Sequence, residues 1–176
     1  MSARGFIELL RLAERARLRK QSIQRHEKGE RWSGVAFRLA GLQFISPLGE
    51  IAEVLNLQDY TPVPGTQPWM LGLSNVRGRL LPLTDLAGFA GLVRNSRHAK
   101  VLVVDQPDLF SGLLVDEVQG IQHFGAENYR PDVEQIPEGL AGMVEGRFED
   151  AQGQHWIVVL PSRLTSDTRY MNAALR

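Results

Sequence analysis

The stretch Trp69-Met-Leu-Gly-Leu-Ser-Asn-Val-Arg-Gly-Arg-Leu-Leu-Pro-Leu-Thr-Asp-Leu86 decides the fold of this chain. Two apolar segments flank Arg77-Gly78, and glycine readily adopts the positive φ that a tight reversal needs. We therefore expect strands over residues 71–76 and 79–83, joined by a turn that holds Arg77. From the residues alone, the Arg77 guanidinium either pairs with a nearby carboxylate or reaches out to a partner, and both alternatives stay open.

The second half of this stretch predicts where its second strand lies and where it ends. Pro82 lacks a backbone N–H, which indicates an edge position in a sheet. Asp85 stands where a short helix over residues 85–91 would begin, as its N-cap.

Further strands are predicted on both sides of this stretch. Alternating or continuous apolar runs bounded by Gly, Pro and Asp cover residues 34–39, 100–105, 112–118, 142–148 and 155–160. A hairpin turn is expected at residues 150–153, and a second short helix at residues 162–170. About ten short strands at this spacing predict an all-β barrel or sandwich instead of a βαβ sheet.

The first 33 residues differ from the rest in charge and in periodicity. They hold nine Lys and Arg against four Glu, a net charge of plus five, while the whole chain is neutral. Apolar residues recur at helical spacing over residues 4–20, which predicts an amphipathic helix. This helix would dock on its own domain, on a partner protein or on an acidic membrane surface. A domain boundary is expected near residues 32–34.

Composition excludes several classes of protein. The chain has 176 residues, 43% of them hydrophobic, and no cysteine. No apolar run approaches the ~20 residues that span a bilayer. The four histidines are isolated, and we find no nucleophile elbow or phosphate-binding loop, so an enzyme is disfavoured. A small β-barrel that binds nucleic acid is the alternative reading, although the expected basic and aromatic face is missing. We expect a cytoplasmic protein without direct membrane insertion.

At this point the sequence resembles a known family. Residues 71–86 resemble the signature of CheW-like chemotaxis adaptor domains, in which G-x-x-N-x-R-G precedes an apolar strand, Pro and D-L. Residues 112–121 resemble the G-x-x-V-D-x-V-x-x-V strand of the same family. The resemblance covers residues 34–170, between an N-terminal helix and linker (1–33) and a C-terminal tail (171–176). Within the family the chain is most similar to PilI-type adaptors of type IV pilus (twitching) chemosensory systems.

The resemblance implies two intertwined five-stranded SH3-like barrels around a shared apolar seam, without enzymatic activity or a cofactor. It also implies two partners, the regulatory domain of a CheA-type histidine kinase and the cytoplasmic helical tip of a chemoreceptor. Nucleic acid is not an expected partner. The protein is expected to be recruited to membrane-associated receptor arrays. The positions that match receptor- or kinase-binding residues are Ile51, Glu53, Val54, Arg77 and Leu164, with Glu53 matching the acidic partner of the arginine. For Ile51 and Val54, plain core positions remain the alternative. The positions that match the motif as scaffold are Asn75, Gly78, Pro82 and Asp85.

Overall fold

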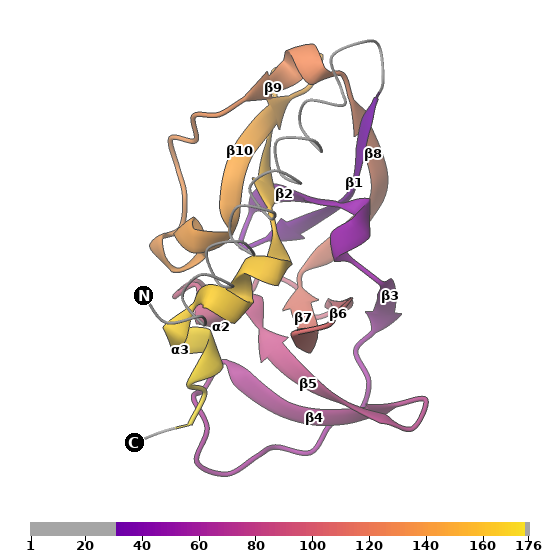
Figure 1. Cartoon of the computed structure of the whole chain (residues 1–176), viewed down its shortest axis with the longest axis vertical. Coiled ribbons are helices and arrows are strands. Elements are labelled where there is room, and N and C mark those ends of the chain that lie inside the picture. The colour runs from indigo at the N-terminus through magenta and orange to yellow at the C-terminus, as the bar shows by residue number, and fades with distance from the viewer. Residues whose placement is uncertain (1–30, 175–176) are drawn as a thin grey trace, which may run out of the picture.

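The computed structural model describes residues 31–174, so the helix expected over residues 4–20 lies outside the described part. Residues 31–174 form two β-sheets that follow one another along the long axis of the molecule (Figure 1). The expectation of a mainly β fold is therefore confirmed. None of the helices within residues 31–174 is long and apolar enough to cross a membrane.

Sheet A, the upper sheet in Figure 1, has the strand order β8-β1-β2-β11-β10-β9. Its strands are β1 (Trp32–Leu39), β2 (Leu42–Pro47), β8 (Glu117–Phe124), β9 (Tyr129–Arg130), β10 (Val144–Glu149) and β11 (His155–Val159). The expected β10–β11 hairpin is confirmed. Parallel pairing of β2 with β11, Phe44 opposite Ile157 and Ile45 opposite Val158, joins this hairpin to β1–β2. Sheet A therefore combines strands from both ends of the described chain.

Sheet B, the lower sheet, has the order β3-β6-β7-β5-β4 and uses the middle of the chain. Its strands are β3 (Glu53–Asn56), β4 (Met70–Val76), β5 (Arg79–Asp85), β6 (Lys100–Gln106) and β7 (Leu109–Val115). The two expected hairpins, β4–β5 and β6–β7, are confirmed. The expectation of two five-stranded sheets holds for sheet B, while the two-residue strand β9 gives sheet A a sixth member.

The edge position expected for Pro82 is wrong, because β5 lies between β4 and β7. The parallel pairing of β5 with β7 begins at Leu83, so the proline stands one residue before that ladder. Proline is tolerated in this internal strand because the ladder to β7 begins after it, although Pro82 lies opposite Leu73 of β4.

Short helical turns connect the strands: η1 (Leu48–Glu50), α2 (Leu86–Phe89), η2 (Ala126–Asn128), η3 (Glu138–Met143), η4 (Pro161–Ser166) and α3 (Thr168–Met171). The helix expected at residues 85–91 is α2. Asp85 occupies its N-cap position, but its side chain makes no capping hydrogen bond. The helix expected at residues 162–170 is divided at Asp167, whose side chain accepts hydrogen bonds from two backbone N–H groups of α3.

Buried apolar residues within 31–174 form three hydrophobic clusters. One lies within sheet A and includes Phe124 and Trp156, and a second lies within sheet B and includes Leu81 and Val103. The largest is shared, since it combines side chains such as Phe37 of sheet A with others from sheet B. Each sheet therefore curls around apolar residues of its own, and the shared cluster forms the expected apolar seam between them.

Candidate functional site

The Arg77-Gly78 turn adopts the conformation that the motif predicts. Arg77 has a φ of 51° and Gly78 a φ of 80°, so both lie in the left-handed region that a two-residue hairpin of this kind requires. The backbone N–H of Gly78 donates to Asn75 Oδ1 at 2.9 Å. Gly78 and Asn75 thus act as scaffold, because they fix the turn that carries Arg77.

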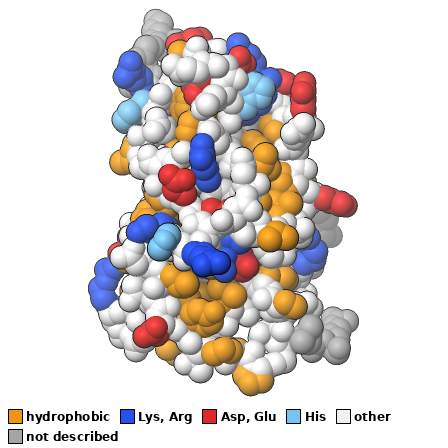
Figure 2. All heavy atoms as spheres, turned by 180° about the vertical axis from the view of Figure 1, so that it is seen from behind, with side chains coloured by type: hydrophobic (Ala, Val, Ile, Leu, Met, Phe, Trp, Pro, Cys, Tyr) orange, Lys and Arg blue, Asp and Glu red, His pale blue; other side chains and the backbone are white. Residues whose placement is uncertain are grey.

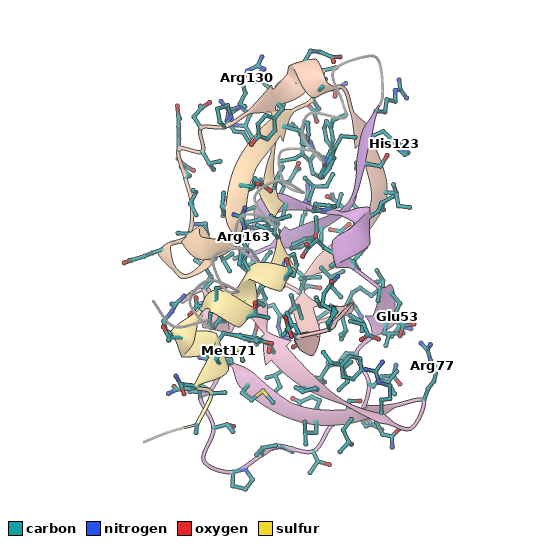
Figure 3. The ribbon with its side chains drawn as sticks, in the orientation of Figure 1. Glu53, Arg77, His123, Arg130, Arg163 and Met171 are labelled. Carbon is teal, nitrogen blue, oxygen red and sulfur yellow. The ribbon has the colours of Figure 1, made fainter. Side chains whose placement is uncertain are left out.

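Arg77 forms an ion pair with Glu53 of β3. Figure 3 shows the Arg77 side chain rising from the hairpin towards Glu53. The Arg77 side chain is 69% exposed, against 32% for Glu53. Because β3 and β4 are the two outermost strands of sheet B, this pair connects the turn that follows β4 to the opposite edge of the sheet. So exposed a pair adds little to stability, and its effect is to orient the guanidinium.

A second cation lies on the same hairpin and was missed by the sequence analysis. Arg79 donates to Asp105 Oδ2 at 2.6 Å and stacks over the Phe110 ring at 3.7 Å. The hydrogen bond from Arg79 holds the pKa of Asp105 below its usual value. The signal was present in the motif, since Arg79 is the first residue of the strand that leaves the Arg77-Gly78 turn. Arg77 and Arg79 give the end of this hairpin two oriented guanidinium groups.

The structure divides the expected binding positions between surface and core. Val54, on the edge strand β3, is 40% exposed. The side chains of its neighbour Glu53 and of Arg77, on the β4–β5 turn, are also accessible. Ile51 is only 9% exposed and Leu164 is fully buried, and both belong to the shared cluster. These two residues have little or no exposed surface, so their assignment as contact residues stays a prediction that their burial does not support.

Apolar surface accompanies the charged hairpin. Leu80, opposite Asn75 in the hairpin, is 61% exposed, and Leu57 beyond β3 is 41% exposed. Figure 2 shows hydrophobic side chains gathered over the lower half of the rear face, the half that contains sheet B. Sheet B therefore combines oriented cations with uncovered aliphatic groups, the composition of a reversible protein-binding surface.

The remaining features do not indicate a cofactor or metal site at this hairpin. Residues 31–174 contain no group of three or more His, Cys, Asp or Glu side chains that could hold a metal ion. A pocket of about 490 Å³ lies at the other end of the molecule, lined by residues such as His123, Asp150 and Trp156. None of the predicted binding residues contributes to it.

Two curled sheets around a shared seam, with the N-x-R-G turn exposed, define a β scaffold that presents a surface to other proteins. The sequence pattern of the CheW-like domain matches residues 33–169, and the chain belongs to this family of chemotaxis scaffold adaptors. It is 39% identical over 151 residues to protein PilI of Pseudomonas aeruginosa, an alignment that spans 85% of this chain and 84% of PilI.

Two further comparisons agree with this assignment. The chain is 35% identical over 72 residues to chemotaxis protein CheW of Thermotoga maritima, which covers 40% of this chain and 48% of that protein. The crystal structure of the scaffolding protein TtCheW from Thermoanaerobacter tengcongensis matches the fold with a TM-score of 0.65. That match has 23% sequence identity and covers 74% of this chain and 89% of the other.

Proposed function

We propose that this chain couples a chemoreceptor to a CheA-type histidine kinase, in control of type IV pilus twitching motility. In this role it binds the helical tip of the receptor's cytoplasmic part and the regulatory domain of the kinase, and it catalyses no reaction. The similarity to PilI supports the pilus pathway. The adaptor is cytoplasmic and is recruited to membrane-associated receptor arrays.

The observation that carries the proposal is the state of the Arg77 guanidinium. It is exposed, oriented by Glu53, and hydrogen-bonded to that carboxylate through a single nitrogen, Nη2. A guanidinium has five N–H donors, so the others stay available to a partner's carboxylate or carbonyl groups. A helical tip that docks here would contact Arg77 and the exposed Val54, and would bury roughly ~800 Å² of this chain.

Signal transfer follows if the receptor and the kinase contact the same rigid scaffold. A shift of the receptor tip can alter the kinase only when the adaptor binds the two receptor states with different free energies. The Arg77–Glu53 pair contributes to that difference by fixing the direction of the guanidinium.

Substitution Arg77→Ala tests the proposal. We expect the melting temperature to stay within a few degrees of the parent, because Arg77 is an exposed turn residue. The affinity for a soluble receptor helical-hairpin fragment should fall by about tenfold, as expected for the loss of a charged hydrogen bond. Arg38→Ala is the matched control, since Arg38 is an exposed cation of sheet A with a 4.0 Å contact to Glu117. Unchanged receptor binding by the Arg77 variant would overturn the proposal.

A further inference from the structure

The loop between α2 and β6 is basic in an acidic domain. No Asp or Glu occurs between Asp85 and Asp105, whereas this interval contains Arg94, Arg97, His98 and Lys100. Residues 31–174 together hold 11 Lys and Arg against 16 Asp and Glu, a net charge of minus five. The positive charge of this loop is therefore a local feature.

The backbone of this loop is fixed by a buried carboxylate. Asp116, at the end of β7, is 5% exposed, and its Oδ1 accepts the backbone N–H groups of Asn95 and Ser96 at 3.0 and 3.1 Å. Its Oδ2 accepts the N–H of Ala40 at 2.7 Å, which ties the loop to the β1–β2 turn. The hydroxyl of Ser96 accepts the N–H of His98 at 3.0 Å. A loop shaped in advance loses less conformational entropy when it binds.

Arg94 and Arg97 stand on either side of the two anchored residues. Neither forms a hydrogen bond or ion pair with another residue of the described range 31–174. Arg77 and Arg79, by contrast, both pair with carboxylates of their own domain. Next to Arg94, the side chain of Val93 is 80% exposed. The loop thus holds two uncompensated guanidinium groups and one uncovered aliphatic side chain on a fixed backbone.

We propose that residues 92–98 form a second docking surface, which binds an acidic segment of a partner protein. Arg94 and Arg97 bind carboxylates of that segment, and Val93 packs against an apolar side chain between them. The chain's own first 33 residues do not fit this role, because they carry a net charge of plus five. This surface is separate from the Arg77 hairpin, so the proposal goes beyond the adaptor function proposed above.

A peptide titration of the full-length protein tests this surface. The probe is a fluorescent 14-residue peptide in which Glu-Asp pairs flank a central Leu, and its Gln-Asn counterpart serves as the neutral comparison. We expect the acidic peptide to bind in 50 mM salt and to bind more weakly in 300 mM salt, because added salt screens exposed charges. The neutral peptide should bind at least tenfold more weakly than the acidic one.

The variants then locate the binding surface. Arg94→Gln with Arg97→Gln should weaken peptide binding at least tenfold while leaving the receptor fragment bound as in the parent. Arg77→Gln with Arg79→Gln removes the same charge elsewhere and should change peptide affinity less than twofold. Equal losses in both double variants would mean unspecific charge attraction and would overturn the proposal. Two other results would also overturn the proposal. One is binding to phosphatidylglycerol vesicles in preference to the peptide, and the other is self-association of the parent protein that the double variant Arg94→Gln, Arg97→Gln abolishes.

Discussion

Glu50 receives two hydrogen bonds from Ser162, a residue 112 positions further along the chain. Its Oε2 accepts the backbone N–H of Ser162 at 2.7 Å, and its Oε1 accepts the hydroxyl at 2.9 Å. Glu50 lies in η1, which connects β2 of sheet A to β3 of sheet B, and Ser162 is the second residue of η4. The segment that joins the two sheets is therefore fastened to the C-terminal region by one carboxylate.

Glu50→Ala should lower the free energy of unfolding by about 2 kcal/mol, since it removes two charge-assisted hydrogen bonds from a partly buried site. Ser162→Ala removes only the hydroxyl and should lower it by about 1 kcal/mol. Urea unfolding of both single variants and of the double variant measures the coupling. Fully additive effects would show that the two side chains do not interact.

Asp116→Asn should destabilise the protein by about 2 kcal/mol, because an amide supplies only one acceptor oxygen where three backbone N–H groups donate. The amide hydrogens of Asn95 and Ser96 should also exchange faster than in the parent. Hydrogen exchange followed by NMR checks this result. If these amides remain protected in the variant, the carboxylate does not fix the loop.

Acid should weaken the attachment of α3 through Asp167. The hydrogen bond from Arg169, supplemented by the backbone N–H groups of Arg169 and Tyr170, lowers the pKa of Asp167 in the folded protein. A lowered folded-state pKa stabilises the fold above the usual Asp value of about 3.9, and this contribution is lost as the pH falls through the folded-state pKa.

We therefore expect the stability difference between the parent and Asp167→Asn to be constant from about pH 5 to 7 and to shrink below about pH 4. Chemical unfolding at a series of pH values, followed by Trp fluorescence, measures the difference. Trp69 is a suitable reporter because its ring stacks on Tyr170 of α3, with centroids 5.6 Å apart. A difference that is independent of pH down to about 2 would contradict the role of the carboxylate.

Gly72→Ala should be strongly destabilising. Gly72 has a φ of 151°, and a Cβ built there would lie 2.2 Å from the backbone oxygen of Thr61. We expect a loss of about 3 kcal/mol, because backbone strain and a clash with main-chain atoms act together. Gly153→Ala is the matched control, since Gly153 has a φ of 75° but open space around it, and should lose about 1 kcal/mol. Thermal unfolding of both variants separates the clash from the strain.

The local features of this fold could be predicted from sequence, because the residues that decide them are adjacent. The Arg77-Gly78 turn, the β6–β7 hairpin and the β10–β11 hairpin each depend on short-range turn chemistry and alternation. The position of Pro82 was not predictable in this way. It depends on the parallel pairing of β5 with β7, a contact between strands that are separated by α2 and β6.

Burial at the candidate site depends on the same long-range contacts. Ile51 and Val54 are an odd number of residues apart, so an extended chain turns them to opposite sides. The structure places Ile51 in the shared cluster and leaves Val54 at the surface. The burial of Leu164 depends on the packing of η4 against the shared cluster. The hydrogen bond between Arg79 and Asp105 joins two residues that are 26 positions apart in the sequence. Neither contact leaves a local pattern in the sequence.

The strand order has a consequence for synthesis on the ribosome. Sheet B is contained in residues 53–115 and can close as soon as those residues have emerged, whereas sheet A must wait for β11, which ends at Val159. The β1–β2 hairpin leaves the ribosome before any strand of sheet B, yet β2 gains its parallel neighbour only after β11 has emerged. Until then β2 presents an unpaired edge, the kind of surface on which nascent chains aggregate or recruit chaperones. Truncation before β11 should therefore yield an insoluble product, even though it leaves every strand of sheet B in place.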